Sequence, residues 1–227
     1  MTRDTILFDI NETVLDLSPL KPKFEAMLGD AAIASTWFAT LLHASTVCAL
    51  TGVKTGFAEL SGLTLDRLAS LHRRTLSSAE RSDILGSFAS LAPHPDVKPA
   101  LKQLRNCSYG TVAFSNSSRE LVSKQIANSG LASLFDLVLS VEETESFKPD
   151  ARVYKYAAAR VGRPIGELRL IAAHDWDTHG AMMAGMKAAY LDRSGAPYNP
   201  LYRRPQISGT TMGGLVDRII AGDTGHA

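Results

Sequence analysis

Four short segments of the chain place chemically versatile side chains directly after apolar runs. They are Asp9-Ile10-Asn11-Glu12-Thr13, Ser115-Asn116, Lys148-Pro149-Asp150 and His174-Asp175-Trp176-Asp177. Carboxylates can serve as nucleophiles or as acid/base groups, hydroxyl and amide groups can hold an anion, and a lysine favours the ionised form of a nearby carboxylate. The four segments therefore predict one polar site, provided that the fold brings them together.

The apolar runs before these segments have the length and composition of buried β-strands. We expect strands at Thr5–Ile10, Gly110–Ser115, Leu137–Ser140, Leu168–Ala173 and Ala188–Leu191. Helical segments separate them, at Pro99–Arg105, Ser118–Asn128, Ala151–Val161 and Thr178–Ala184. This alternation predicts an α/β fold with a doubly wound, mostly parallel sheet, which binds ligands at the carboxyl ends of its strands.

One region lacks comparable strands and instead repeats apolar residues at helical spacing. It runs from about Leu17 to Leu91, and Trp37 with Leu41 is one example of the spacing. We interpret residues 17–91 as a helical cap inserted after the first strand, and residues 1–16 and 92–227 as the core domain. The segment Ala92-Pro93-His94-Pro95 returns the chain to the sheet, because neither proline suits a helix interior.

Composition excludes several classes of function. The 24 Lys and Arg residues nearly balance the 23 Asp and Glu residues, which leaves no basic surface for nucleic acid or an anionic membrane. Cys48 and Cys107 form no zinc-binding pattern and are expected to be reduced thiols. There is no signal peptide and no run of about 18 apolar residues, so we expect a cytoplasmic protein with no membrane partner.

Taken together and in this order, the segments resemble the haloacid dehalogenase superfamily over the whole chain. Asp9, Ser115, Lys148 and Asp177 match the superfamily's nucleophile, its hydroxyl residue, its lysine and its acidic loop. The resemblance implies that Asp9 attacks the substrate and that Lys148 keeps it ionised, while Ser115 helps to hold the substrate anion. Thr13 is expected to support the nucleophile's loop.

Two positions distinguish the chain from the phosphatases of that superfamily. Those enzymes have a second Asp two residues after the nucleophile, where this chain has Asn11, which cannot exchange a proton. Their Mg²⁺-binding Gly-Asp pair aligns with Ala172-Ala173, so a metal ligand is missing. We therefore expect no metal site, and the Mg²⁺-dependent phosphatase becomes the alternative function. A non-catalytic relative that only binds a small acid is a second alternative.

The L-2-haloacid dehalogenases are similar in several local strings. These are Ser115-Asn116, Lys148-Pro149-Asp150 followed by Arg152-Val153-Tyr154, and Trp176-Asp177 before Gly180-Ala181. The resemblance implies hydrolysis of short L-2-haloalkanoic acids to 2-hydroxy acids through an ester on Asp9. It places Asn11, Asn116, Trp176 and Tyr154 at the substrate, requires no cofactor and implies a homodimer.

The chain departs from that family at the cap residue that receives the halide. Alignment on Trp37 puts Phe38 where the family has an arginine. The halide would then rest on Asn116, Trp176 and the positive edge of Phe38. Arg3, Lys54 and Arg73 remain as alternative cations.

A second departure is a pair of ionisable residues. His174 stands where the family has Asn, and Glu12 replaces a small residue. Because the first and fourth strands should be neighbours, both side chains can reach one pocket, where a carboxylate-supported histidine can activate water. The alternatives are that Asp177 is the base, or that Glu12 and His174 are only structural.

Overall fold

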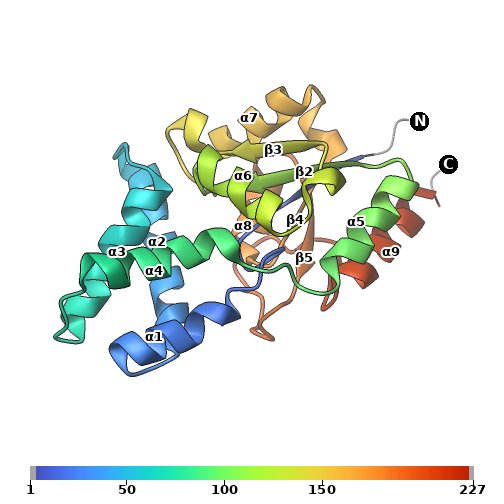
Figure 1. Ribbon diagram of the computed structural model, residues 1–227. Helices are drawn as coiled ribbons and strands as arrows, with labels where there is room; N and C mark the ends of the chain where they lie inside the picture. Colours follow the sequence, from blue (N-terminus) through green and yellow to red (C-terminus); the bar gives the residue numbers. More distant parts are fainter. Residues whose placement is uncertain (1–3, 225–227) are drawn as a thin grey trace.

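The core of the protein is a six-stranded parallel sheet with the order β3-β2-β1-β4-β5-β6 (Figure 1). This computed structural model describes residues 4–224. The strands are β1 (Thr5–Phe8), β2 (Gly110–Ser115), β3 (Leu137–Ser140), β4 (Leu168–Ala172), β5 (Lys187–Leu191) and β6 (Ile207–Gly209). The predicted parallel sheet is confirmed, and the short strand β6 is an addition that the sequence did not predict. The prediction that the first and fourth strands are neighbours is also confirmed, because β1 pairs with β4.

Helices cover both faces of the sheet. They are α5 (Val97–Asn106), α6 (Arg119–Asn128), α7 (Ala151–Val161), α8 (Asp175–Met183) and α9 (Met212–Thr224). Right-handed crossovers put α5 and α6 on one face and α7 and α8 on the other, and α9 packs beside α5. Local capping fixes where some helices begin: Ser118 Oγ accepts a hydrogen bond from the Leu121 amide at the start of α6.

The helices and 3₁₀ turns between β1 and α5 form a region without strands. It comprises α1 (Lys21–Leu28), α2 (Ile33–Thr51), α3 (Phe57–Leu71), α4 (Ser78–Ser87) and 3₁₀ turns at Ser18–Leu20 and Phe88–Ser90. These helices lie together beside the sheet (Figure 1). The two connections to the core run side by side, because the Asp16 amide donates to the Ala92 carbonyl (2.9 Å) and the His94 amide to the Val14 carbonyl (2.9 Å).

The centre of this helical region is aromatic. The ring of Trp37 is fully buried on α2 and packs against Phe24 and Phe88, with centroids 5.6 and 5.7 Å away. Its Nε1 donates a hydrogen bond of 3.1 Å to the Ser61 carbonyl on α3. This cluster fixes α2, which carries Phe38 toward the core.

By length and composition alone, α2 is the one helix within residues 4–224 that could cross a membrane. The sequence contains no uninterrupted apolar run there, because Ser, Thr and His residues punctuate the helix. Ile33, Trp37 and Leu41 lie on one face of α2 and are buried in the protein, as in the core helix of a globular domain.

Candidate active site

The carboxyl ends of β1, β2 and β4 bring the predicted segments into one site. Asp9 comes directly after β1, and its amide donates a hydrogen bond of 3.0 Å to the Ile171 carbonyl on β4. Its side chain is nearly covered, with 8% of the residue exposed. A buried carboxylate has to be compensated by hydrogen bonds or charge, and the neighbours of Asp9 supply both.

Lys148 provides the first compensation. Its Nζ donates to Asp9 Oδ1 (3.1 Å), Asp177 Oδ2 (3.0 Å) and the Phe114 carbonyl (3.0 Å), so all three of its N–H groups are used. Only 1% of its side chain is exposed. Lys148 is therefore fixed as an ion-pair partner and has no proton left to donate to a substrate.

The charges of this cluster shift the pKa values of its members. Burial raises the pKa of Asp9, but the Lys148 charge and the His174 contact outweigh it and hold the pKa well below its usual range. Burial lowers the pKa of Lys148, but the charges of Asp177 and Asp9 raise it overall. Asp9 is accordingly a carboxylate, the form in which it can act as a nucleophile.

Asp177 and Tyr154 lie behind Lys148. Asp177 Oδ1 accepts a hydrogen bond of 2.6 Å from the Tyr154 hydroxyl, and both residues are fully buried. Burial and the Asp9 charge raise the pKa of Asp177 despite the presence of Lys148. The sequence predicts that Tyr154 contacts substrate; in the structure its hydroxyl contacts Asp177, in the first turn of α8.

Gly180 permits this close packing. A Cβ at Gly180 would lie 2.6 Å from Pro149 Cβ and 2.9 Å from the Tyr154 hydroxyl. Distances this short cannot be accommodated without a shift of the Lys148-Pro149 loop. The glycine after Trp176-Asp177 is therefore needed for the position of Lys148.

Thr13 contacts both Asp9 and the loop after β4. Its hydroxyl donates a hydrogen bond of 2.8 Å to Asp9 Oδ2 and accepts one of 2.9 Å from the Ala173 amide. The Thr13 carbonyl in turn accepts from Arg193 Nη2 (3.2 Å), and Arg193 pairs with Asp96. Arg193 could not be predicted as a site residue from the sequence, because it follows β5 without a motif.

The last residue of β2 and the residue that follows it make different contacts. Ser115 Oγ accepts from the Ser117 amide (3.1 Å), and Ser115 is fully buried. Asn116 Oδ1 accepts from the Lys148 amide (3.0 Å), which ties the two loops together. Asn116 is 7% exposed.

The side-chain nitrogen and oxygen of Asn11 both form hydrogen bonds with other side chains of the protein. Its Nδ2 donates to Ser117 Oγ (3.2 Å), and its Oδ1 accepts from Gln125 Nε2 (3.0 Å). Gln125 is fully buried on α6 and also donates to the Phe88 carbonyl at the end of the cap (2.9 Å). The sequence predicts that Asn11 binds substrate, whereas in the structure its side-chain amide contacts Ser117 and Gln125 of the core, and Gln125 makes the contact with the cap. Gln125 could not be predicted from the sequence, since a single glutamine on a helix carries no signal.

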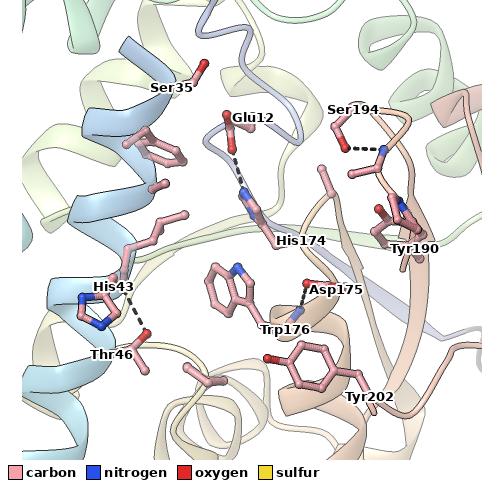
Figure 2. A pocket seen from close by; sticks show the side chains of 17 residues that line it. Glu12, Ser35, His43, Thr46, His174, Asp175, Trp176, Tyr190, Ser194 and Tyr202 are labelled. Atoms are coloured by element: carbon pink, nitrogen blue, oxygen red, sulfur yellow. Dashed lines mark hydrogen bonds and ion pairs between the residues drawn. The ribbon is translucent and has the colours of Figure 1, made fainter. Parts of the chain in front are cut away.

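Glu12 and His174 form the pair expected from the sequence. Glu12 Oε2 lies 2.7 Å from His174 Nε2 (Figure 2). His174 Nδ1 lies 3.4 Å from Asp9 Oδ2. Glu12 adopts a φ of 65°, a left-handed conformation that is uncommon outside glycine and is often held at functional sites. The ring of His174 stacks on Trp176, with centroids 5.2 Å apart.

This environment favours the charged imidazolium. Burial lowers the pKa of His174, but the contacts with Asp9 and Glu12 outweigh burial and raise the pKa to about 10. In the resting protein His174 is therefore protonated at neutral pH. It becomes a base only after it loses that proton.

Glu12 and His174 line two cavities. A cavity of about 530 Å³ is lined by α2 and by the loops after β4 and β5, with Trp176, Tyr190 and Tyr202 in its wall (Figure 2). A second cavity, of about 360 Å³, is lined by residues that include Lys21, His94 and Arg193. Phe38, Glu12 and His174 line both cavities.

Two of the three alternative cations for the halide lie away from the two cavities. Lys54 is exposed and paired with Glu145, and Arg73 is exposed at the end of α3. Neither is among the lining residues of the two cavities, and Arg3 lies outside the described residues. Within residues 4–224, Lys148 and His174 are the cations that contact Asp9.

The carboxylates of the site do not fit a magnesium ion. Mg²⁺ requires octahedral oxygen ligation, whereas Asp9, Asp177 and Glu12 each pair with Lys148 or His174. Ala172 and Ala173 supply no side-chain oxygen. Over residues 4–224, no cluster of three or more His, Cys, Asp or Glu side chains could hold a metal ion.

Comparison with known proteins identifies the family. The family model of the haloacid dehalogenase-like hydrolases matches residues 3–171, and the chain belongs to this family.

Several similar proteins carry dehalogenase names. The (S)-2-haloacid dehalogenase H-109 of Pseudomonas putida is 28% identical over 218 residues, which cover 95% of this chain and 97% of that protein. The (S)-2-haloacid dehalogenase 1 of Pseudomonas sp. strain CBS-3 is 27% identical, covering 89% and 91%. The L-2-haloacid dehalogenase of Xanthobacter autotrophicus, solved with chloropropionic acid covalently bound, superposes with a TM-score of 0.89. It is 21% identical and covers 97% of this chain and 99% of its own.

Proposed function

We propose that this protein hydrolyses the carbon–halogen bond of short L-2-haloalkanoic acids and produces D-2-hydroxy acids by inversion. The observation that carries the proposal is the state of Asp9: a nearly buried carboxylate held ionised by Lys148, Thr13 and His174. Such a group is a ready nucleophile for a carbon that bears a halide. Related proteins named (S)-2-haloacid dehalogenases support the choice of substrate.

The first step is displacement at C2 of the acid. An oxygen of Asp9 attacks C2 from the side opposite the halogen, the C–O bond forms, and the halide leaves with its bonding electrons. The product is an ester on Asp9. A structure of the Xanthobacter autotrophicus relative with chloropropionic acid covalently bound supports this route.

Several residues hold the substrate in this proposal. Asn116 uses its oxygen for the Lys148 amide, which leaves its NH₂ group for an anion. Trp176 and Phe38 line the larger cavity and offer ring edges to the halide. Ser115 shapes the turn after β2 that presents backbone N–H groups to the carboxylate.

The second step hydrolyses the ester, and it needs a base. We propose that His174, held by Glu12, removes a proton from the water that attacks the ester carbonyl. Asp177 is less suited to this task, because its two oxygens already accept from Lys148 and Tyr154 and it is fully buried. Its part is to position Lys148.

The reaction as proposed requires no metal and no cofactor. No phosphoryl charge develops, so Asn11 and Ala173 are compatible with the chemistry. The phosphatase alternative needs a carboxylate pair for Mg²⁺, and the contacts of Asp9 and Asp177 do not favour it.

The cellular setting is also a proposal. We propose a cytoplasmic homodimer with no nucleic-acid or membrane partner. Val47 and Leu50 are exposed on α2, and Leu63 is exposed on α3, which supports association through apolar side chains. Sedimentation equilibrium would measure the subunit number.

Halide release from each enantiomer of 2-chloropropionate tests the function. With EDTA present, we expect the protein to consume the L-enantiomer and to yield the D-hydroxy acid. Retention of configuration, a strict requirement for Mg²⁺, or phosphate release from p-nitrophenyl phosphate in place of halide release would contradict the proposal.

A matched pair of variants assigns the activity to the site. Asp9→Asn should abolish halide release, since an amide is a far poorer nucleophile than a carboxylate. Asp217→Asn makes the same chemical change on the exposed surface of α9 and should retain activity. Equal activity of the two variants would contradict the assignment.

A further inference from the structure

Both ring nitrogens of His174 lie within ion-pair distance of carboxylate oxygens. Nε2 lies 2.7 Å from Glu12 Oε2, and Nδ1 lies 3.4 Å from Asp9 Oδ2. A neutral imidazole has one N–H, so its other nitrogen would present a lone pair to a carboxylate. The geometry therefore selects the imidazolium, and the stack on Trp176 adds a favourable cation–π contact.

The two carboxylates differ in what happens to them during the proposed reaction. Glu12 keeps its charge throughout, whereas Asp9 loses its charge when its ester forms. After that step Nδ1 of His174 faces an uncharged ester oxygen. Burial, which disfavours the imidazolium, is then opposed by Glu12 alone.

The other charged groups of the site do not change during this step. Lys148 contacts the other carboxylate oxygen of Asp9, at 3.1 Å from Oδ1, and its charge becomes less compensated once Asp9 is esterified. That change further disfavours a positive His174. The remaining ionisable groups around the pair are Asp175 and Asp177 on α8, His94 at the Glu12 carbonyl, Arg193 at the Thr13 carbonyl, His43 on α2, and Asp16 and Lys21 in the second cavity.

We propose that esterification of Asp9 is the event that converts His174 from a cation into a base. This inference rests on the proposed dehalogenase function and adds a control of timing to it. His174 cannot take a proton from water before the ester exists, and it becomes able to do so at the moment when water is needed.

The protons balance over one turnover. In the first step the C–O bond forms, the C–halogen bond breaks, and the halide departs. His174 then releases its proton to solvent through the cavities that it lines. In the second step water adds its oxygen to the ester carbonyl, one of its protons ends on the hydroxy acid and the other on His174. The net products are the hydroxy acid, a halide ion and one proton.

The amount of ester at steady state tests this switch. The protein turns over L-2-chloropropionate at pH values from about 5.5 to about 9. Each reaction is then quenched with acid, and the intact protein is weighed by mass spectrometry. We expect mostly ester at the lowest pH and mostly free protein at the highest pH. The midpoint is the pH at which half of the protein carries the ester, and below it hydrolysis should speed up about tenfold per pH unit. An ester fraction that does not change with pH would overturn the switch.

Two variants identify the group that titrates. Glu12→Gln removes the charge that still favours the imidazolium in the ester, so the midpoint should move to lower pH. His94→Gln alters a histidine that contacts only the Glu12 carbonyl in this pair (3.2 Å), so the midpoint should stay. A midpoint that moves with His94→Gln, or that Glu12→Gln leaves in place, would overturn the assignment to His174.

The protonation of His174 before the ester forms can be measured by NMR. In protein labelled with ¹⁵N-histidine, both nitrogens of His174 should give the chemical shifts of an imidazolium at pH 8. Shifts of a neutral ring there would overturn the switch. Absence of both halide and ester at every pH would instead overturn the proposed function, and this inference with it.

Discussion

Lys148 Nζ lies 3.1 Å from Asp9 Oδ1 in a setting from which water is almost excluded, with 1% and 11% of the two side chains exposed. The same Nζ also bonds Asp177 and the Phe114 carbonyl. Removal of one partner from a buried ion pair is costly, because the remaining charge stays buried without compensation.

Lys148→Met should therefore destabilise the protein by roughly 3–5 kcal/mol and should abolish halide release. Urea unfolding measures the first effect, and a halide assay measures the second. Lys98→Met makes the same change at an exposed position of α5 and should be nearly neutral for both. Similar losses in the two variants would contradict the role given to Lys148.

His174→Ala should separate the two chemical steps. Asp9 attacks as a carboxylate and needs no base, so the first halide per active site should be released nearly as in the unaltered protein. Turnover should then slow by about 10²–10⁴-fold, with the ester visible as added mass on the intact protein. Turnover at the unaltered rate would exclude His174 as the base, and loss of the first halide would show a role in holding substrate.

The protonation of His174 should also appear in stability. Its pKa in the folded protein is about 10, above the value of about 6.5 expected in the unfolded chain. The imidazolium therefore contributes its full stabilisation below about pH 6.5, and this contribution is lost as the pH rises toward 10.

Unfolding free energies measured between pH 6 and 10 test this linkage. The difference between the unaltered protein and His174→Gln should shrink with rising pH, by roughly 1.4 kcal/mol per pH unit within that window. His43→Gln on the exposed side of α2 should follow the unaltered protein. Parallel curves for the unaltered protein and His174→Gln would show that the ring is not charged in the folded state.

Two helical glycines give contrasting expectations. A Cβ at Gly180 would lie 2.6 Å from Pro149 Cβ, whereas a Cβ at Gly86 on α4 would meet nothing within 4 Å. Gly180→Ala should cost about 1–3 kcal/mol and reduce activity by displacing the Lys148 loop, while Gly86→Ala should be neutral or slightly stabilising. Thermal unfolding compares them, and equal midpoints would argue against the packing role of Gly180.

The sequence predicts those contacts of the site that are made by residues following the strands of the sheet. Asp9, Lys148 and Asp177 could be predicted to meet, because the carboxyl ends of parallel strands share one edge of a sheet. The pairing of Glu12 with His174 followed from the same argument, since β1 and β4 are neighbours.

Contacts that arise from the packing of helices could not be predicted from the sequence by this argument. Gln125 bridges Asn11 and the Phe88 carbonyl only because α6 packs beside the end of the cap. Tyr154 looked like a substrate contact because the string after Lys148 resembles a family motif, yet its hydroxyl faces Asp177. The charge of His174 depends on two carboxylates that reach its ring together, which a sequence pattern does not reveal.

The central claim is that Asp9 itself supplies the oxygen of the first product. A single-turnover reaction with protein in excess over L-2-chloropropionate, run in H₂¹⁸O, measures this directly by mass spectrometry of the hydroxy acid and of the peptide that contains Asp9. The account predicts a first product without ¹⁸O and an Asp9 side chain that has gained ¹⁸O. A first product that carries ¹⁸O at C2, with Asp9 unlabelled, would show direct attack by water and would contradict the covalent route.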